Sequence, residues 1–409
     1  MAASARGAGR TTGTTYDVVV VGAGSAGEVV AARLGDAGVP VALVGRSHDS
    51  RGGCERWAGR GVTPVRGTGR LAGERVVEVD GERLVARRAV VLATGARPVM
   101  PPVPGLAGVR SWDASALRVP RSLVVLGGDP AGLELAQAVK RRGAASVVVL
   151  GDAGSLLPQE ERFAGEEVRA ALESEGVVVA VAARVQGVGR AGTDGPLRVD
   201  VAGGRTFVAD EIAVAAGAAA DTTGLGLESV GLQTAGAGPA LAVDDAFAVT
   251  RVAGGWLYAV GACTGRVAGP HVARYQARVV SDVLVGRPAR DRAADVVPRL
   301  VRTDPPVAAV GLTAAQARDR GIPVTVLEHR APRPVATGSF RPGTSRLVVD
   351  DAADVVVGAT FTGDGATELL HAATVAITGR VTLADLWHAV PVAGTASEAW
   401  VRLLETAGL

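Results

Sequence analysis

Short runs of apolar residues alternate along this chain with amphipathic segments and glycine-rich turns. The clearest runs are residues 18–21, 40–44, 89–95, 122–126, 146–150, 211–217 and 256–261. Uninterrupted apolar runs of this length are typical of strands buried on both faces of a parallel sheet. The pattern therefore predicts an α/β fold in which strands alternate with helices.

The first of these runs ends in a glycine loop. Gly22, Gly24 and Gly27 follow four valines at G-x-G-x-x-G spacing, and an amphipathic helix pattern continues to residue 34. The first glycine permits a tight turn, the second lets a pyrophosphate approach the backbone, and the third lets helix and strand pack closely. The helix N-terminus then offers free N–H groups to an anion. This combination predicts a Rossmann-type βαβ unit rather than an ordinary glycine-rich loop.

A second unit of the same kind begins at residue 122. Its glycines are Gly127, Gly128 and Gly132, with Asp129 in the middle position of the motif. A carboxylate that binds ribose is expected after the second strand of such a unit. The first unit has Gly45 and Arg46 there, and the second unit has Gly151, so neither supplies the expected acid directly after the strand.

The rest of the chain predicts a hairpin, a ribbon and a separate C-terminal domain. Residues 65–86 alternate around an Asp80–Gly81 turn, residues 98–104 form a proline-rich linker, and residues 177–201 suggest a β-ribbon. From residue 300 the pattern favours an α+β domain with an antiparallel sheet, including a helix that begins with Thr313 as its N-cap. Glu28 and Glu134 are expected in the first turns of their helices, where the helix dipole stabilises them.

Together these elements predict an α/β protein with two Rossmann-like domains and a C-terminal α+β domain. The predicted boundaries are a disordered leader at 1–15, a first domain at 16–118 with 240–290, a second at 119–239, and a third at 298–409.

Composition narrows the class of protein further. The formal net charge of +2 gives no strong attraction to nucleic acid, and no apolar run approaches the roughly 18 residues of a membrane span. The only cysteines are Cys54 and Cys263, so a disulfide framework is not expected. The five histidines have no metal-ligand spacing, and no metal site is predicted. We expect a cytoplasmic protein without a signal peptide.

Six motifs resemble the pyridine nucleotide-disulfide oxidoreductase family, which includes dihydrolipoamide dehydrogenase and mercuric reductase. They are residues 22–27, 93–95, 127–136, 256–265, 273–278 and 304–313. The resemblance implies FAD bound near Gly22, Gly24, Gly27, Thr94, Gly95 and Gly261, and NAD(P) bound near Gly127 and Gly132. It also implies a homodimer formed through the C-terminal domain.

The departures from the family pattern affect its chemistry. The family forms a redox disulfide between two cysteines that are separated by four residues, but here Gly59 occupies the position of the second cysteine, so Cys54 has no partner for that disulfide. The resemblance also implies that a long helical segment of the family is missing between about residues 59 and 62. Gly45 and Ala262 replace two carboxylates that hold the flavin nucleotide, a loss of about 3–6 kcal/mol of binding. Ala393 and Gly394 replace the His-Pro pair that reaches the partner subunit.

Candidate catalytic residues lie around the former redox site. We hypothesise Glu55 as an acid/base, Arg56 as a contact for an anionic group and Trp57 as a stacking wall; a solvated remnant loop is the alternative. Cys263 is expected to be buried as a small hydrophobic side chain. The remaining candidates are His271 and Tyr275 near the flavin end of the cleft, and His388 and Glu398, which could reach across a dimer.

The leading sequence-based hypothesis is a redox-degenerate homodimer that performs a non-redox reaction on a small molecule in the former flavin cleft. Cyclisation, isomerisation or elimination in a biosynthetic pathway would suit such a cleft. The sequence leaves FAD open as a cofactor, whereas NAD(P) is not expected to bind because the Asp129 carboxylate would repel the pyrophosphate. The alternatives are an FAD-dependent oxidoreductase without a disulfide relay and a non-catalytic partner subunit of an intact reductase.

Overall fold

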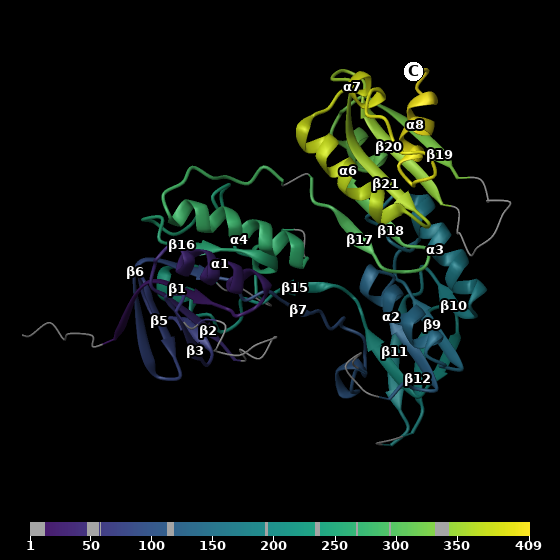
Figure 1. Cartoon of the computed structure of the whole chain (residues 1–409). Helices are drawn as coiled ribbons and strands as arrows, with labels where there is room; N and C mark the ends of the chain where they lie inside the picture. Colours follow the sequence, from purple (N-terminus) through teal and green to yellow (C-terminus); the bar gives the residue numbers. More distant parts are fainter. Residues whose placement is uncertain are drawn as a thin grey trace, which may run out of the picture. The chain divides into compact units, whose positions relative to one another are not determined.

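The computed structural model describes residues 13–46, 57, 59–112, 118–192, 195–233, 238–266, 269–293, 296–331 and 343–409. The chain forms two compact units (Figure 1). Unit 1 comprises residues 1–97 with 218–292, and unit 2 comprises residues 98–217 with 293–409. Strand β1 begins at Thr14, before the predicted end of the leader, and residues 1–12 lie outside the described residues.

Unit 1 is built on one large sheet. Its strands run in the order β3 (Val62–Arg66), β2 (Val41–Gly45), β1 (Thr14–Val21), β6 (Glu82–Leu92), β5 (Val76–Val79) and β4 (Gly69–Leu71), with β16 (Leu257–Ala259) also paired to β6. Strands β3, β2, β1 and β6 are parallel, as is the β6–β16 pair. Helices α1 (Ser25–Asp36) and α4 (Pro270–Leu284) pack against each other and cover one face (Figure 1).

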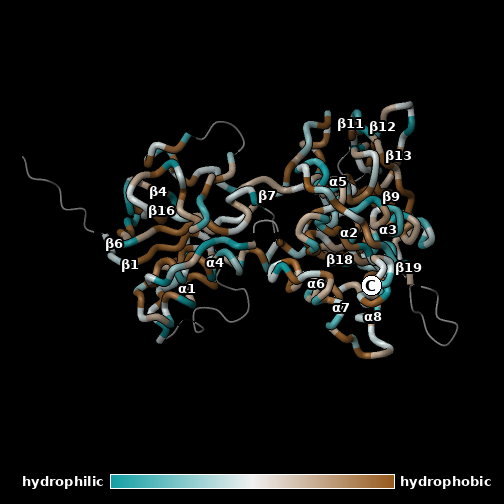
Figure 2. Tube along the Cα trace, turned by 90° about the horizontal axis from the view of Figure 1, so that it is seen from above, coloured by the Kyte–Doolittle hydropathy of each residue, from teal (hydrophilic) through white to brown (hydrophobic). Residues whose placement is uncertain are grey.

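The four valines of β1 are buried on both faces of this sheet, as predicted. Val18 and Val20 join the core beneath α1 and α4, whereas Val19 and Val21 join the core on the opposite face. Part of the trace of β1 is brown, for hydrophobic, in Figure 2. The expected parallel βαβ unit is therefore confirmed.

The predicted hairpin turn is also confirmed. Val79 pairs with Glu82, which leaves Asp80 and Gly81 as a two-residue loop with φ of 48° and 93°. Positive φ at both positions matches the right-handed twist of the flanking strands, and Asp-Gly adopts it readily.

The first part of unit 2 is the second βαβ unit. Its parallel sheet has the order β10 (Val177–Ala180), β9 (Ser146–Leu150), β8 (Ser122–Leu126) and β14 (Glu211–Val214), with helices α2 (Pro130–Arg141) and α3 (Arg162–Ser174). A separate antiparallel sheet contains β11 (Val185–Arg190), β12 (Leu197–Val201) and β13 (Arg205–Ala209). The predicted ribbon therefore began too early, because β10 belongs to the parallel sheet. Strands β7 (Ala96–Pro98) and β15 (Ala218–Ala220) form a two-stranded sheet.

The C-terminal part of unit 2 has the predicted antiparallel sheet. Its strands run in the order β17 (Arg299–Val301), β18 (Val307–Gly311), β21 (Val355–Thr362), β20 (Thr344–Asp350) and β19 (Val324–Arg330). Its helices are α5 (Ala314–Asp319), α6 (Ala366–Gly379), α7 (Leu383–Trp387) and α8 (Glu398–Glu405). Thr313 caps α5 in a capping box with Gln316, as its sequence predicts.

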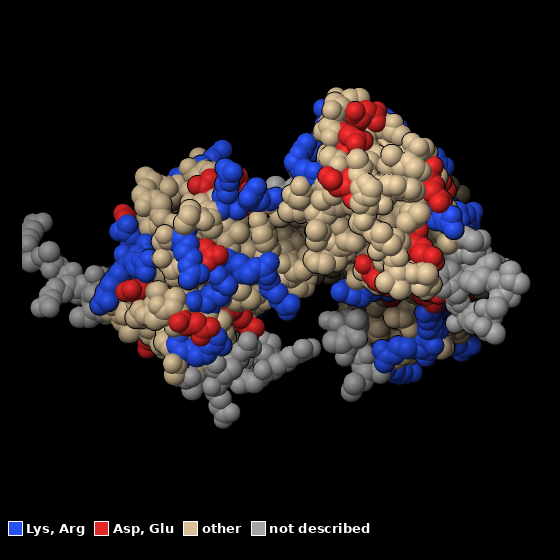
Figure 3. Space-filling model, turned by 45° about the horizontal axis from the view of Figure 1, so that its top comes forward, with Lys and Arg blue, Asp and Glu red and all other residues tan. Residues whose placement is uncertain are grey.

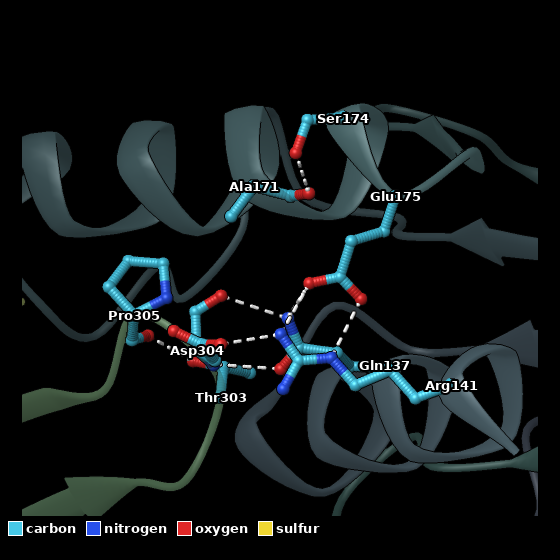
Figure 4. A network of polar contacts seen from close by, with 8 residues as sticks. All are labelled: Gln137, Arg141, Ala171, Ser174, Glu175, Thr303, Asp304 and Pro305. Atoms are coloured by element: carbon cyan, nitrogen blue, oxygen red, sulfur yellow. Dashed lines mark hydrogen bonds and ion pairs between the residues drawn. The ribbon is translucent and has the colours of Figure 1, made fainter. Parts of the chain in front are cut away.

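A polar network joins α2 to the chain segment between β17 and β18 (Figure 4). The amide of the buried Gln137 donates to Glu175 Oε1 and to the Asp304 carbonyl, both at 2.9 Å, and its Oε1 accepts from the Asp304 N–H at 2.7 Å. Arg141 binds Glu175 and Asp304, each at 2.6 Å. The Glu175 contact, followed by that of Asp304, raises the pKa of Arg141. The Gln137 side chain thus forms hydrogen bonds with both the N–H and the carbonyl of Asp304.

We expect Gln137→Leu to lower the free energy of unfolding by about 2–4 kcal/mol, because it removes hydrogen-bond partners from part-buried polar groups. Urea titration measures the change. The control is Arg169→Met, which removes an exposed ion pair with Glu173 and should change stability by no more than about 0.5 kcal/mol. Equal effects of the two substitutions would show that the network contributes little.

None of the helices in the described part of the chain combines the length and the apolar character needed to cross a membrane.

Candidate functional site

A cleft of about 720 Å³ opens at the carboxyl ends of the strands in unit 1. Its walls come from five places: the glycine loop after β1, the end of β2 with the turn before β4, residues 93–95 after β6, residues 221–225, and residues 260–262 with the start of α4. We call this the unit-1 cleft. Ligands of open α/β sheets bind at this edge, so its position suits a nucleotide.

The glycine loop has the geometry that its spacing predicts. Gly22 has φ of 114°, and a Cβ there would overlap the Ala93 carbonyl oxygen. Gly24 lines the cleft, and a Cβ there would meet no described atom within 4 Å. Gly27 faces the other way: a Cβ would overlap the Gly22 carbonyl oxygen, so this glycine lets α1 approach β1. The first N–H groups of α1 have no acceptor within the helix and are available to an anion.

The other predicted flavin contacts, Thr94, Gly95 and Gly261, also line the cleft. Thr94 Oγ1 donates to the Asp221 carbonyl at 2.6 Å, and the Asp221 N–H donates to the Gly95 carbonyl at 3.0 Å. The Gly261 N–H donates to the buried Gln276 Oε1 at 2.6 Å. Sequence reasoning missed the positioning roles of Asp221 and Gln276, although Gln276 lies in one of the quoted motifs.

The residues of the cleft fit a dinucleotide held by its pyrophosphate, but they lack two carboxylate contacts. Gly45 and Ala262 both line the cleft, so the predicted gaps lie at the ligand site. A Cβ at Gly45 would approach the Ala23 Cβ to 2.6 Å, which leaves no room for an acidic side chain without a shift of the loop. A dinucleotide bound here would therefore depend on the backbone N–H groups and the remaining walls.

A second cavity of about 700 Å³ lies in unit 2, and we call it the unit-2 pocket. Gly127 and Asp129 line it, whereas Gly132 packs against Gly127 and Ala215. Burial and, to a lesser extent, the nearby Asp152 raise the pKa of Asp129. Asp129 precedes α2, and its carboxylate forms no capping hydrogen bond with any described N–H of that helix. The N-terminus of α2, where a pyrophosphate would bind, thus carries the Asp129 carboxyl group, and Asp152 lines the same pocket.

The two glutamates assigned to first turns differ. Glu28 lies in the first turn of α1, as predicted. Glu134 does not lie in the first turn of α2; its Oε1 accepts the Arg302 N–H at 2.7 Å. Its role is a tertiary hydrogen bond, which the sequence pattern of α2 does not reveal.

The structure places Trp57 in the hydrophobic core of unit 1, where it is 2% exposed, and not on the cleft wall as hypothesised. A side chain buried in this core cannot stack on a ligand in the cleft. The candidates Glu55 and Arg56, and Cys54 before them, lie outside the described residues. Gly59 follows in a turn, and β3 begins three residues later.

Cys263 is fully buried, as predicted, and its Sγ donates to the Val260 carbonyl at 3.2 Å. Burial raises the pKa of this thiol, so the reactive thiolate is disfavoured.

In a Cys54→Ala variant, we expect the remaining Cys263 to react with a chromogenic disulfide reagent at least roughly a hundredfold more slowly in native protein than in guanidinium chloride. Absorbance of the released thiolate follows the reaction. Immediate modification of the folded variant would contradict burial of the thiol.

His271 and Tyr275 both lie on α4, beside the cleft. The ring of His271 is close to Gly269, a cleft residue, but neither His271 nor Tyr275 is among the described residues that line the cleft. The Tyr275 hydroxyl accepts the Arg292 N–H at 3.0 Å. Exposed Arg274 and Arg278 share this surface, and Figure 3 shows basic side chains gathered on unit 1. These positions favour a structural role for Tyr275.

His388 and Glu398 are exposed in the C-terminal part of unit 2, at the end of α7 and the start of α8. Between them, Val390 and Val392 are 86% and 72% exposed. Such apolar exposure next to polar side chains is typical of an interaction surface. The predicted contact across a dimer remains a prediction.

Within the described part of the chain, no group of three or more His, Cys, Asp or Glu residues is arranged to hold a metal ion.

Comparisons with known proteins place these features in a family. The family described as pyridine nucleotide-disulphide oxidoreductase matches residues 16–277, and its dimerisation domain matches residues 297–404. A mercuric reductase of Acidithiobacillus ferrooxidans is 33% identical over 337 residues, which cover 80% of this chain and 59% of that protein. A glutathione reductase of Burkholderia cepacia is 33% identical over 348 residues, covering 84% of this chain and 75% of that protein.

Solved structures agree on the fold. The HOCl-induced flavoprotein disulfide reductase RclA of Escherichia coli superposes with a TM-score of 0.82 at 22% identity, covering 95% of this chain and 99% of that one. The chain spans less than two thirds of the mercuric reductases from Acidithiobacillus ferrooxidans and Shigella flexneri. Since the family matches more than half of the sequence, with relatives at 33% identity, the chain belongs to the pyridine nucleotide-disulphide oxidoreductase family.

Proposed function

We propose that this protein is a homodimeric, FAD-dependent oxidoreductase that works without a cysteine relay. The observation that carries the proposal is the open unit-1 cleft, in which Gly24 leaves the pyrophosphate position clear of described side chains. The match to the dimerisation domain supports a homodimer. Gly59 at the second cysteine position excludes the family's usual intrachain dithiol. We favour the FAD-dependent reaction over the non-redox reaction that the sequence alone favoured, because the cleft retains the space of a dinucleotide site.

FAD, when bound, would supply the two-electron chemistry. The N-terminal N–H groups of α1 would hold its pyrophosphate, and the hydrogen bonds of Thr94 and Asp221 would fix the opposite wall. Gln276 would hold the loop at Gly261 in place. The chain's own contribution is thus to bind and orient the cofactor.

We further propose that NAD(P)H is a poor ligand of the unit-2 pocket. A carboxylate about 4 Å from a phosphate costs roughly 4 kcal/mol at an effective dielectric constant of 20. Asp129 and Asp152 both line the pocket, and the raised pKa of Asp129 reflects this unfavourable surrounding. The redox partners would then be small molecules that enter the unit-1 cleft.

A second candidate is the non-redox reaction: cyclisation, isomerisation or elimination of a small molecule in the unit-1 cleft. The absence of carboxylates at Gly45 and Ala262, both in the cleft, favours it because flavin affinity falls when those contacts are lost. Here the cleft would serve as a pocket for a substrate in place of FAD.

Titration of the full chain with FAD separates these candidates. If the protein is an FAD-dependent oxidoreductase, we expect saturable FAD binding with a perturbed flavin spectrum near 450 nm. We also expect no NADPH-dependent reduction of glutathione disulfide or Hg(II). Failure to bind FAD at roughly 100 μM, well above the affinity that two missing contacts would leave, would overturn it in favour of the second candidate. Ordinary NADPH turnover with a disulfide would contradict both.

A further inference from the structure

We propose that the Asp221 carboxylate accepts hydrogen bonds from the ribityl hydroxyl groups of a flavin nucleotide in the unit-1 cleft. The ribityl chain is the sugar chain that joins the flavin ring to the phosphates. The inference rests on the proposed function of the cleft, and it adds the side chain that contacts the flavin half of the ligand.

The strand order of unit 1 determines which half of a dinucleotide lies near Asp221. Strand β1, which leads into the glycine loop, lies between β2 and β6, and the adenosine ribose is expected at the end of β2. Thr94 and Gly95 follow β6, on the other side of β1. Asp221 is hydrogen-bonded to both of them and lines the cleft. The half of the ligand that meets Asp221 is therefore the flavin half.

Hydrogen bonds hold the backbone around Asp221 in place. Its carbonyl accepts from Thr94 Oγ1 at 2.6 Å, and its N–H donates to the Gly95 carbonyl at 3.0 Å. The next residue, Thr222, is fully buried, and its hydroxyl donates to the Pro239 carbonyl at 3.0 Å. Because this main chain is already ordered, a ligand that binds the carboxylate does not have to order it.

The Asp221 carboxylate is available to a ligand. It forms no hydrogen bond or ion pair with any residue that the structure describes, and Asp221 is half-buried. The other charged residue among the described lining of the cleft is Arg46, which follows β2. The Asp80 carboxylate lies beside Gly67, near the turn before β4, but Asp80 is not among the lining residues. Asp221 thus supplies the carboxylate of the described cleft lining.

A carboxylate suits a sugar chain because an ionised carboxyl group only accepts hydrogen bonds and each hydroxyl has a proton to donate. Acidic residues bind ribose hydroxyls in this way in dinucleotide sites. Here Gly45 and Ala262 line the cleft without a polar side chain. Strand β15 packs against η4 (Gly261–Thr264), and Asp221 directly follows β15. A segment beside Ala262 therefore provides an acceptor that neither position carries.

Titration of the full chain with three probes tests the inference: FAD, FMN and 5′-ADP. FAD and FMN carry the ribityl chain, whereas 5′-ADP carries only the adenosine half. We expect Asp221→Ala to weaken FAD and FMN binding by roughly ten- to a hundredfold, the effect of one lost hydrogen bond to a charged group, and to leave 5′-ADP affinity within roughly twofold of the wild type. Flavin fluorescence measures the first two affinities, and calorimetry measures the third.

Two further variants separate this contact from a general loss of structure. Asp221→Asn keeps the volume and one carbonyl acceptor but removes the charge, so it should lose less FAD affinity than Asp221→Ala. Asp245→Ala makes the same change at an exposed position of unit 1 that is not among the lining residues, and it should leave all three affinities unchanged. Urea unfolding of Asp221→Ala should match that of the wild type, because the backbone hydrogen bonds of residue 221 do not involve the carboxylate.

The outcomes separate this inference from the proposed function. Wild-type FAD binding that Asp221→Ala leaves unchanged would remove the inference and leave the FAD proposal standing. Tighter FAD binding by Asp221→Ala would do the same, since the carboxylate would then repel the phosphates. An equal loss of 5′-ADP affinity would also overturn the inference, because the adenosine half would then depend on Asp221. If the wild-type chain does not bind FAD, both proposals are overturned.

Discussion

A Gly24→Val variant is expected to lose FAD affinity by roughly a hundredfold or more while keeping the wild-type free energy of unfolding. The added side chain would enter the open part of the unit-1 cleft, where a Cβ meets no described atom within 4 Å. It would block the approach of a pyrophosphate to the N-terminus of α1, where each lost hydrogen bond to a charged group is worth about 1.5–3 kcal/mol. Flavin absorbance titration and urea unfolding measure the two quantities.

Two other glycines provide controls for this experiment. Gly108→Val makes the same change at an exposed glycine in unit 2, where a Cβ likewise meets no described atom within 4 Å, and should alter neither quantity. Gly27→Ala should destabilise the fold, because its Cβ would overlap the Gly22 carbonyl oxygen. Unchanged FAD binding by Gly24→Val would mean that FAD does not use this loop.

Replacing Asp129 by glycine is expected to raise NADPH affinity by roughly ten- to a hundredfold. The change restores the middle glycine of the G-x-G-x-x-G motif and removes a carboxylate whose pKa is raised by burial and by Asp152. The repulsion removed is up to roughly 4 kcal/mol for a charge pair about 4 Å apart. NADPH fluorescence titration measures the affinity.

An Asp129→Asn variant separates charge from space. It removes the charge but keeps the volume, so it should recover part of the affinity gained by glycine. Asp152→Asn should give a smaller gain, since Asp152 contributes the lesser part of the pKa rise. If neither Asp129 variant binds NADPH more tightly, some other feature of the unit-2 pocket excludes the nucleotide.

The same carboxyl group predicts a pH-dependent stability. Asp129 has a higher pKa in the folded protein than its ordinary value of 3.8, so its ionisation opposes folding as the pH rises above that value. Asp129→Asn should therefore be more stable than the wild type at neutral pH, and the difference should vanish below about pH 3.8. Urea titrations at several pH values measure it; a difference that grows toward acid would contradict the assignment.

The amino-acid sequence by itself determined the parallel fold, the turns and the capped helix. Four valines after Tyr16, the Asp80–Gly81 pair and Thr313 each specify local geometry through their own backbone preferences and hydrophobicity. The G-x-G-x-x-G spacing likewise placed Gly22 and Gly24 at the cleft, because a strand, a turn and a helix that are contiguous in sequence fix their positions. These properties depend on neighbours within a few residues.

Only the tertiary structure decided which side chains meet at the site. Trp57 resembled a cleft residue by its place in the sequence, but it is buried in the hydrophobic core of unit 1. Glu134 bonds the distant Arg302, and Asp152 approaches Asp129 across the carboxyl ends of two strands. Ala23 closes the space beside Gly45, which leaves Arg46 as the charged group at the end of β2. Such contacts join residues far apart or on different elements, so no local pattern encodes them.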